Sequence, residues 1–333
     1  MSRKIIFRGQ PRLPFEEFDD EPGLRDNPGT RRRPQPESDL SDKNSDKKAN
    51  SERLHYISFG SGSSGNSCYI GTDTMGLIVD AGIRPDAMED KMKEAGISMN
   101  MVKALLLTHD HSDHVRYAYK LVRSSRHISL YCTPRVLNGL LRRHNISKRI
   151  KDYHTPIFKE IPFKIGPLEI TAFDVSHDGS DNMGFFIEYA GHHFALATDL
   201  GEVGERAEYY MSRANYLVIE SNYDSEMLRI GRYPEYLKAR IRATNGHLDN
   251  VQTAEFLTRI VSPELRYVFL CHLSQDNNTP AKALECVRDA LEGKGIKVGN
   301  AEVSGYDERV GGLQLMALPR FDASRKFVFR KLK

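Results

Sequence analysis

The segment from Thr108 to His114 carries the densest group of side chains able to bind a metal. It reads THDHSDH, so three imidazoles and two carboxylates fall within six residues. Neutral imidazole and carboxylate suit Zn, Mn or Fe, and the absence of thiolates argues against a structural Cys-rich zinc site. In an extended stretch His109 and His111 point to the same side, and Asp113 and His114 can reach a second ion once the chain turns. The segment therefore predicts a metal centre with room for two adjacent cations.

Two ions need more ligands than this segment offers, and three other apolar runs end in a suitable residue. His177 closes the run 168–175, Asp199 closes 193–198, and His272 closes 267–271. Taken alone, each of them would more often be a polar side chain with satisfied hydrogen bonds at a strand end than a metal ligand. Their repeated placement, together with the first segment, predicts ligands that converge.

Apolar strands and helices must position these residues. We expect strands at 54–59, 68–70, 77–80, 102–107, 128–132, 168–175, 184–189, 193–198, 216–220 and 267–271. We expect helices at 86–95, 115–122, 134–143, 205–211, 234–241, 250–260 and 280–291. This alternation, without internal repeats, predicts one large α/β domain over 54–333.

Composition excludes several classes of protein. The chain has 333 residues, 39% of them hydrophobic, and 48 basic against 45 acidic side chains give a net charge of +3. No apolar run approaches the roughly 20 residues of a membrane span, and the N-terminus lacks the apolar core of a secretory signal. Four scattered cysteines are typical of free thiols in a reducing compartment. We therefore expect a cytoplasmic protein with no membrane partner.

Residues 1–53 differ from the rest of the chain. They hold 12 Lys or Arg, 11 Asp or Glu and six of the fifteen prolines. Such a segment cannot bury enough apolar area to offset its ordering entropy, so we expect a mostly disordered tail.

Several longer motifs resemble one protein family. They are FGSGSSGN (59–66), VDAG (79–82), LLLTHDHSDH (105–114), VSHDG (175–179), TDLG (198–201), LVIESNYDSEML (217–228), GRYPEYLKARI (231–241), GHLDN (246–250) and CHLSQDNNTP (271–280). HxHxDH resembles the metallo-β-lactamase fold superfamily, and the other motifs are most similar to the YycJ/WalJ (VicX) family of exonucleases. Two departures are visible: Asp110 stands where the family usually has Glu, and Asp249 where it usually has Ser.

The resemblance implies a fold and a set of ligands. The fold is a four-layer αββα sandwich, with two mixed β-sheets packed face to face and helices outside. His109, His111 and His177 would hold one divalent ion, and Asp113, His114 and His272 the other, with Asp199 bridging both. Two such ions, Mn²⁺ or Zn²⁺ or else Fe, can supply a metal-bound hydroxide as nucleophile in phosphodiester cleavage. Asp113 would thus stand beside the catalytic hydroxide.

Further site residues follow from the same resemblance. His247, just before the helix at 250–260, is similar to the histidine that assists the leaving group in RNase Z-like relatives, and Asn250 could cap that helix. Asp80 would orient the metal-binding loop, a role that acids behind metal ligands often take. Candidates behind the ligands or at the substrate rim are Ser63, Asn66, Glu220, Ser221 and Asn222. The pair His192 and His193 reads instead as a surface turn.

The expected function is a dinuclear-metal phosphodiesterase acting on nucleic acid, with DNA favoured over RNA. Family resemblance implies an exonuclease of 5′–3′ polarity. Basic segments such as Arg142-Arg143 suit a polyanionic substrate. A phosphodiesterase for cyclic nucleotides or other small molecules is the alternative, and a thioester or lactam hydrolase is a further one. The oligomeric state, the choice between exo- and endonuclease, and the purpose of residues 1–53 stay open.

Overall fold

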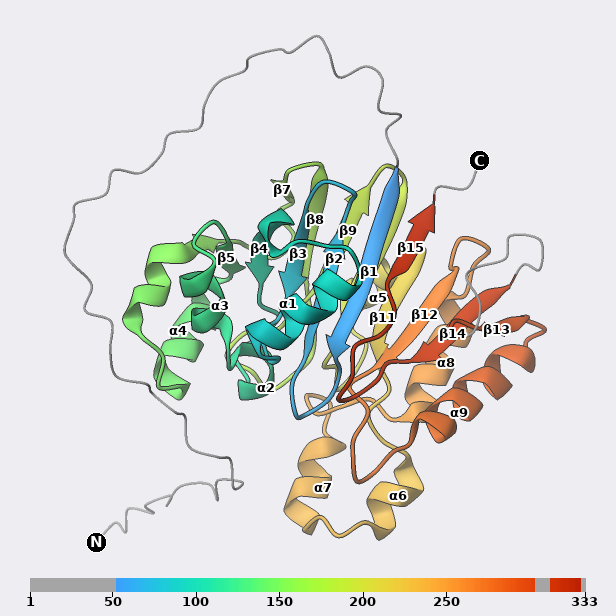
Figure 1. The fold of residues 1–333 in the computed structure, drawn as a ribbon. Coiled ribbons are helices and arrows are strands. Elements are labelled where there is room, and N and C mark those ends of the chain that lie inside the picture. Colours follow the sequence, from blue (N-terminus) through green and yellow to red (C-terminus); the bar gives the residue numbers. More distant parts are fainter. Residues whose placement is uncertain (1–51, 303–311, 331–333) are drawn as a thin grey trace, which may run out of the picture. The chain divides into compact units, whose positions relative to one another are not determined.

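Two β-sheets face each other in the computed structural model, which describes residues 52–302 and 312–330 (Figure 1). The first sheet has the strand order β15-β1-β2-β3-β4-β5-β6. Its strands are β1 (Arg53–Gly60), β2 (Ser67–Gly71), β3 (Gly76–Val79), β4 (Val102–Leu106), β5 (Ser129–Cys132), β6 (His154–Pro156) and β15 (Phe327–Arg330). β2 runs antiparallel to β1 and β3, whereas β3, β4, β5 and β6 run parallel to one another.

The second sheet has the order β13-β14-β12-β11-β10-β9-β8-β7. Its strands are β7 (Phe163–Ile165), β8 (Leu168–Asp174), β9 (Met183–Tyr189), β10 (His192–Ala197), β11 (Tyr216–Glu220), β12 (Tyr267–Cys271), β13 (Val298–Asn300) and β14 (Leu313–Ala317). β10, β11 and β12 are parallel. Their carboxyl ends therefore meet at one edge of the sheet.

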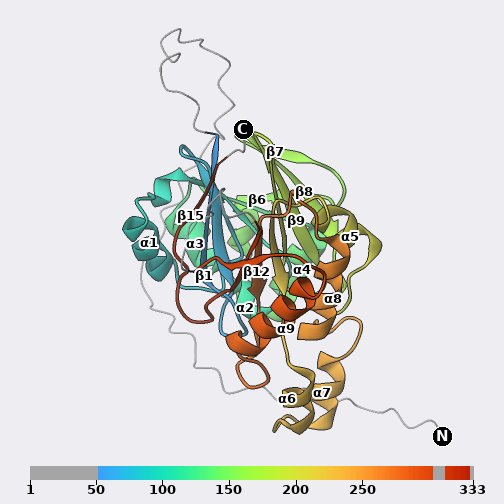
Figure 2. The ribbon, with the colours of Figure 1, turned by 90° about the vertical axis from the view of Figure 1, so that its right-hand side faces the viewer.

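Helices cover the outer face of each sheet (Figure 2). Side chains of α1 (Pro85–Glu94), α3 (Ala118–Ser124) and α4 (Pro134–Arg143) join the core of the first sheet. Side chains of α5 (Glu205–Met211), α8 (Asn250–Ile260) and α9 (Pro280–Glu292) form a second core on the second sheet. The remaining helices are α2 (Ser112–Val115), α6 (Ser225–Ile230), α7 (Glu235–Ile241) and the 3₁₀ turns η1 (Met99–Met101) and η2 (Lys148–Tyr153). The predicted four-layer αββα sandwich is confirmed.

Aromatic rings join the two sheets. Tyr56 on β1 lies 5.1 Å from Phe194 on β10 and 5.0 Å from Phe269 on β12, measured between ring centroids. Phe327 on β15 meets Phe269 edge-on at 4.8 Å. Such buried aromatic pairs add roughly 0.5–1.5 kcal/mol each beyond their area burial. They hold the two sheets in a fixed relation, which lets strand ends from both sheets build one site.

Three local predictions were wrong. The helix expected at 115–122 is interrupted, because the backbone N–H of Tyr117 donates to the carbonyl of Ala81 at 2.8 Å instead of continuing a helix. His192 is buried in β10, its Nδ1 2.9 Å from the Tyr216 hydroxyl. The turn lies at Ala190 and Gly191, whose φ angles are 48° and 81°.

The third correction concerns the start of α8. Asp249, rather than Asn250, caps it: its carboxylate accepts from the Gln252 N–H at 2.7 Å, and the Gln252 side chain accepts from the Asp249 N–H at 3.0 Å. Ser caps helices about as well as Asp, so Asp249 fills the capping role and capping does not account for the departure from Ser.

The expected tail, residues 1–53, lies outside the described residues except for Glu52 and Arg53. Arg53 already belongs to β1, and the carbonyl of Glu52 lies 2.8 Å from His192 Nε2. No helix in the described ranges has the length and apolar character needed to cross a membrane. All four cysteines are described, and all four are free.

Candidate metal centre

The carboxyl ends of strands from both sheets bring the seven predicted ligands together. His109 and His111 follow β4, and Asp113 and His114 lie in α2. From the second sheet, His177 follows β8, Asp199 follows β10 and His272 follows β12. Among the described residues, their nitrogen and oxygen atoms form three overlapping groups of three within 4.8 Å of one another, and a fourth group joins Asp199 and His272 with Glu220 and His247; each group could hold an ion.

Two of these groups match the two ligand sets expected from the resemblance. One consists of His109, His111 and His177, and the other of Asp113, His114 and His272. Asp199 lies between them: its Oδ2 is 3.2 Å from His114 Nε2, and its Oδ1 is 3.7 Å from His177 Nε2. A carboxylate in this position can reach ions in both groups.

Unpaired buried atoms indicate that the donor set fits divalent ions. His109 Nε2 and His272 Nε2 are buried without a hydrogen-bond partner. Buried polar groups are nearly always satisfied, so such atoms call for a ligand. Imidazole and carboxylate without thiolate match Zn²⁺, Mn²⁺ or Fe²⁺.

Charges at the first ligand group and at Asp199 suit a cation. Burial lowers the pKa of His109, and burial with the neighbouring His177 lowers the pKa of His111 to about 4. Both rings are therefore neutral and able to donate a lone pair. Although burial alone would raise the pKa of Asp199, the adjacent His272 and His114 hold it well below its usual range. The ionised Asp199 leaves negative charge at the centre of the histidines.

Asp80 fixes the ring of His114. Its Oδ2 lies 2.7 Å from His114 Nδ1. The backbone N–H of Thr108 donates to Asp80 Oδ1 and the Thr108 hydroxyl donates to Asp80 Oδ2, both at 2.8 Å. With Nδ1 held in this way, His114 turns Nε2 towards Asp199 and Asp113. Asp80 has a φ of 60° and His272 a φ of 53°. Non-glycine residues rarely adopt this left-handed conformation, and such strain is typical of functional sites.

Glu220 is more central than its sequence suggested. It ends β11 fully buried, and its Oε1 lies 2.7 Å from His247 Nδ1 and 2.8 Å from His272 Nδ1. Its Oε2 accepts from the Leu200 N–H at 2.7 Å. One carboxylate thus orients a predicted ligand and a predicted proton donor. In the sequence, this role was indicated by an acidic residue at the end of an otherwise apolar strand.

His247 lies at the rim of the ligand groups, half-buried. Its ring centroid is 5.1 Å from that of His177 and 5.3 Å from that of His272. Since Glu220 occupies Nδ1, Nε2 remains available for a different partner. The position suits a group that exchanges a proton beside the metals.

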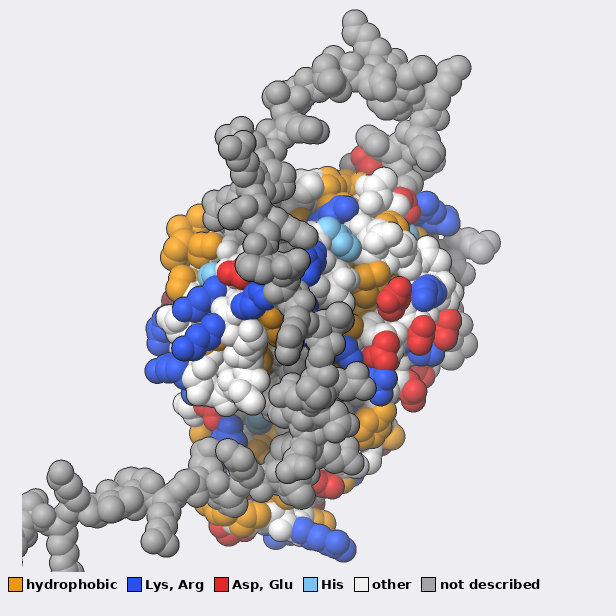
Figure 3. Space-filling view, turned by 60° about the vertical axis from the view of Figure 1, so that its left-hand side comes forward, with side chains coloured by type: hydrophobic (Ala, Val, Ile, Leu, Met, Phe, Trp, Pro, Cys, Tyr) orange, Lys and Arg blue, Asp and Glu red, His pale blue; other side chains and the backbone are white. Residues whose placement is uncertain are grey.

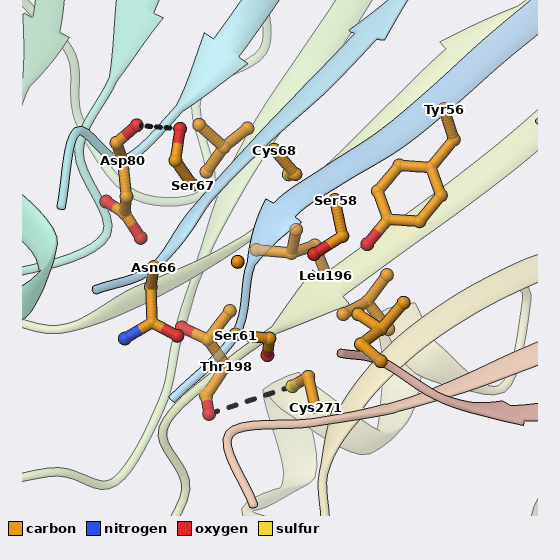
Figure 4. Close-up of a pocket in the computed structure, with 14 residues that line it drawn as sticks. Tyr56, Ser58, Ser61, Asn66, Ser67, Cys68, Asp80, Leu196, Thr198 and Cys271 are labelled. Carbon is orange, nitrogen blue, oxygen red and sulfur yellow. Dashed lines mark hydrogen bonds between the residues drawn. The ribbon is translucent and has the colours of Figure 1, made fainter. Parts of the chain in front are cut away.

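The loop between β1 and β2 lies beside the ligand atoms, and Figure 4 shows its residues Ser61 and Asn66 in a pocket that Asp80 also lines. The Asn66 amide lies 3.2 Å from Asp113 Oδ2 and 2.9 Å from His114 Nε2, next to the ligand atoms. The N–H groups of Gly62, Gly65 and Asn66 all form hydrogen bonds within the protein, so they are not offered to a phosphate. Ser63 is exposed and has no hydrogen bond to a described residue.

Ser61, which was not among the predicted site residues, accepts a hydrogen bond from the His272 N–H at 2.9 Å. Ser221 and Asn222 lie behind the site. Ser221 donates to the Asn250 side chain at 2.7 Å, and Asn222 donates to the His272 carbonyl at 2.7 Å. Both are buried, and they hold α8 and His272 in place.

Asp110 couples the metal-binding loop to the loop after β8. It is fully buried, and its two carboxylate oxygens accept from the Ser180 N–H and hydroxyl, both at 2.7 Å. Asp178, next to His177, places Oδ1 3.3 Å from His111 Nε2 and accepts from Arg240 Nε at 2.7 Å. Neither role was visible in sequence, because both depend on contacts between residues more than 60 positions apart.

Comparison with known proteins agrees with this geometry. The family described as "Beta-lactamase superfamily domain" matches residues 77–272. Exodeoxyribonuclease YycJ of Bacillus anthracis is 37% identical over 249 residues, covering 74% of this chain and 93% of the relative. Exodeoxyribonuclease WalJ of Streptococcus pneumoniae is 33% identical over 224 residues, covering 67% and 82%.

Among solved structures, the metallo-β-lactamase fold protein YhfI of Bacillus subtilis superposes with a TM-score of 0.56 at 14% identity. The match covers 84% of this chain and 99% of that one. At this identity the similarity concerns the fold.

Proposed function

Since the chain belongs to the metallo-β-lactamase superfamily and is a metal-dependent hydrolase of that group, we propose that it is a dinuclear-metal phosphodiesterase that degrades DNA as an exonuclease. The observation that carries the proposal is the position of His247, which the buried Glu220 holds beside both ligand groups. Besides the ions, phosphodiester cleavage needs a group that transfers a proton to the leaving oxygen, and His247 is in position to do this.

The ligand groups support two ions, Mn²⁺ or Zn²⁺ or else Fe²⁺. His109, His111 and His177 would hold one, Asp113, His114 and His272 the other, and Asp199 would contact both. Bound there, the ions would supply Lewis-acid activation of water and stabilise charge on the phosphoryl oxygens.

The chain's own residues supply the remaining steps. His247 donates a proton from Nε2 to the leaving oxygen, while Glu220 holds its Nδ1 and stabilises the protonated ring. The amide of Asn66, 3.2 Å from Asp113 Oδ2 and 2.9 Å from His114 Nε2, would position these two ligands. Asp80, Asn222 and Ser61 keep His114 and His272 oriented.

The choice of DNA rests on the relatives, two of which are named exodeoxyribonucleases. The 5′–3′ polarity follows the family resemblance. The catalytic domain would begin at Glu52 and Arg53, which respectively contact β10 and belong to β1, and the chemistry would not need the residues before them.

One assay tests the proposal. The purified chain with Mn²⁺ is offered DNA labelled at the 5′ or the 3′ end, RNA, cyclic nucleotides and a thioester, beside the variants His111→Ala and His127→Ala. His127 is an exposed histidine that precedes β5, whereas the predicted ligands follow the carboxyl ends of strands or lie in α2, so it controls for loss of an imidazole. We expect mononucleotides released from the 5′ end, lost in His111→Ala and kept in His127→Ala.

Other outcomes would contradict the proposal. Internal fragments would make the protein an endonuclease. Cleavage of cyclic nucleotides alone would favour the small-molecule phosphodiesterase. Hydrolysis of the thioester without any phosphodiester cleavage would overturn phosphodiester chemistry altogether.

A further inference from the structure

A hollow between α4 and η2 is lined by cationic side chains. Arg135, Arg142 and Arg143 come from α4, Lys148 and Lys151 come from η2, and Ser180 borders them. None of the described residues that line this hollow, which we call the basic groove, is acidic. Figure 3 shows the side of the protein towards which α4 lies, where Lys and Arg side chains gather.

Most of these cations lack an ionic partner. Arg143 Nε lies 3.4 Å from Asp110 Oδ2. Among residues 52–302 and 312–330, the other four form no ion pair with a carboxylate. Since the whole chain has a net charge of only +3, the groove concentrates positive charge that the surface as a whole does not carry. A hollow with one sign of charge focuses the field and attracts polyanions.

Four of the cations form two pairs, one on each helix. Arg135 and Arg142 are seven residues apart on α4, which places them on one face about 10 Å apart along the axis. Lys148 and Lys151 are three residues apart on a 3₁₀ helix, where such positions eclipse one another with a rise of about 6 Å. Arg142 and Arg143 also suit the C-terminal dipole of α4, but that dipole does not explain the lysines on η2. Repeated positive charge along a hollow suits the repeated phosphates of a nucleic acid strand.

The basic groove adjoins the metal centre. Ser180, on its border, donates both of its hydrogen bonds to Asp110, and Asp110 stands between the predicted ligands His109 and His111. Arg143 meets the same carboxylate. The side chain of one buried acid thus joins the groove to the loop that carries the ligands.

We propose that the basic groove binds the backbone phosphates of the single DNA strand that extends from the metal centre. This inference rests on the proposed function and adds where the uncleaved part of the substrate lies. The groove pairs with phosphates, so it raises affinity and holds the strand without reading its sequence.

The test compares two variants of equal charge change in the full-length, metal-loaded protein. Arg142→Gln/Lys148→Gln alters the groove. Lys294→Gln/Arg330→Gln removes one exposed Lys that follows α9 and one exposed Arg that ends β15. β15 is the edge strand opposite β6, and Figure 1 places α9 and α4 on opposite sides of the molecule. Binding of a fluorescent 20-nucleotide DNA and of a dinucleotide is titrated at several salt concentrations.

We expect the groove variant to bind the 20-mer about 10-fold more weakly at low salt. Its slope of log affinity against log salt should be shallower by roughly 0.7 for each phosphate of the single strand that the protein no longer neutralises. The control variant should match the unaltered protein, and dinucleotide binding should not change. Equal 20-mer affinity in both variants, or an equally large weakening of dinucleotide binding, would overturn the inference.

Hydrolysis of thymidine 5′-(p-nitrophenyl phosphate) separates this inference from the proposed function. We expect the groove variant to keep kcat and KM for this small ester, whereas its KM for the 20-mer rises. If the unaltered protein cleaves no phosphodiester but the groove variant still loses 20-mer binding, the proposed function fails and the groove stands. If DNA is cleaved with an unchanged KM in the groove variant, the groove inference alone fails.

Discussion

His247 Nδ1 lies 2.7 Å from Glu220 Oε1, and the same oxygen lies 2.8 Å from His272 Nδ1. A single buried carboxylate therefore aligns two imidazoles that approach the metal centre from different segments of the chain. Groups that orient metal ligands in this way commonly change affinity or activity by roughly 10- to 100-fold when they are removed.

Glu220→Gln should lower kcat for DNA by about 10- to 100-fold. The amide keeps the shape and can still accept from the Leu200 N–H, but it holds the protonated His247 less strongly. Steady-state kinetics with metal analysis measures the change, and Glu208→Gln is the control, because Glu208 is a carboxylate paired with Arg259 outside the site. Activity equal to that of the control would show that Glu220 does not position these rings.

His247→Asn should reduce kcat by about 10²- to 10⁴-fold, the usual contribution of a general acid. The metal content should stay the same, because the two predicted ligand sets do not include His247. On a substrate whose leaving group needs no proton, such as a p-nitrophenyl ester, the His247→Asn variant should lose much less activity. A variant that loses its metals, or that slows both substrates equally, would contradict proton donation.

Removing the metals should lower the melting temperature by several degrees. Ions that bind only the folded chain stabilise it by mass action, about 2.7 kcal/mol at a concentration 100 times the Kd. Calorimetry before and after chelation measures this, and elemental analysis should find about two ions per chain. His177→Ala should lose one ion, and Asp199→Asn should weaken both. A melting temperature unchanged by chelation would argue against the site.

The thiols should react slowly in the folded protein at pH 8. Burial raises the pKa of Cys132 to about 12, and burial also raises the pKa of Cys68, Cys271 and the half-buried Cys286. Only the thiolate attacks an alkylating reagent, so a raised pKa means less reactive thiol at a given pH, and labelling should increase as the pH rises. Mass spectrometry should detect label first on Cys286 and on all four cysteines after unfolding. Early labelling of Cys132 would contradict its burial.

Deleting residues 2–50 should leave the metal content and the melting temperature unchanged. The deletion must stop before Glu52, because the Glu52 carbonyl is within hydrogen-bonding distance of His192 in the second sheet. A matched deletion of residues 2–53 should be less stable, since it also removes the first residue of β1. A loss of metal in the shorter deletion would show that the tail supports the catalytic domain.

Elements with strong local signals were predictable residue by residue. The bounds expected for α4, α5, α8, β11 and β12 agree with the structure, because apolar periodicity and end residues are local properties. The residues expected as ligands also stood out locally, since His109, His177, Asp199 and His272 each come shortly after the end of an apolar strand. The sequence by itself thus determined the elements and the chemical types of the site.

Tertiary structure decided how these parts meet. The hydrogen bond from Tyr117 to Ala81 interrupted a helix that the local pattern favoured. Packing against β11 buried His192. The contacts of Glu220 with His247 and His272, and of Asp110 with Ser180, join residues 27, 52 and 70 positions apart. Local propensity carries no information about such pairs, because their energy arises only when two sheets have packed and brought separate strand ends together.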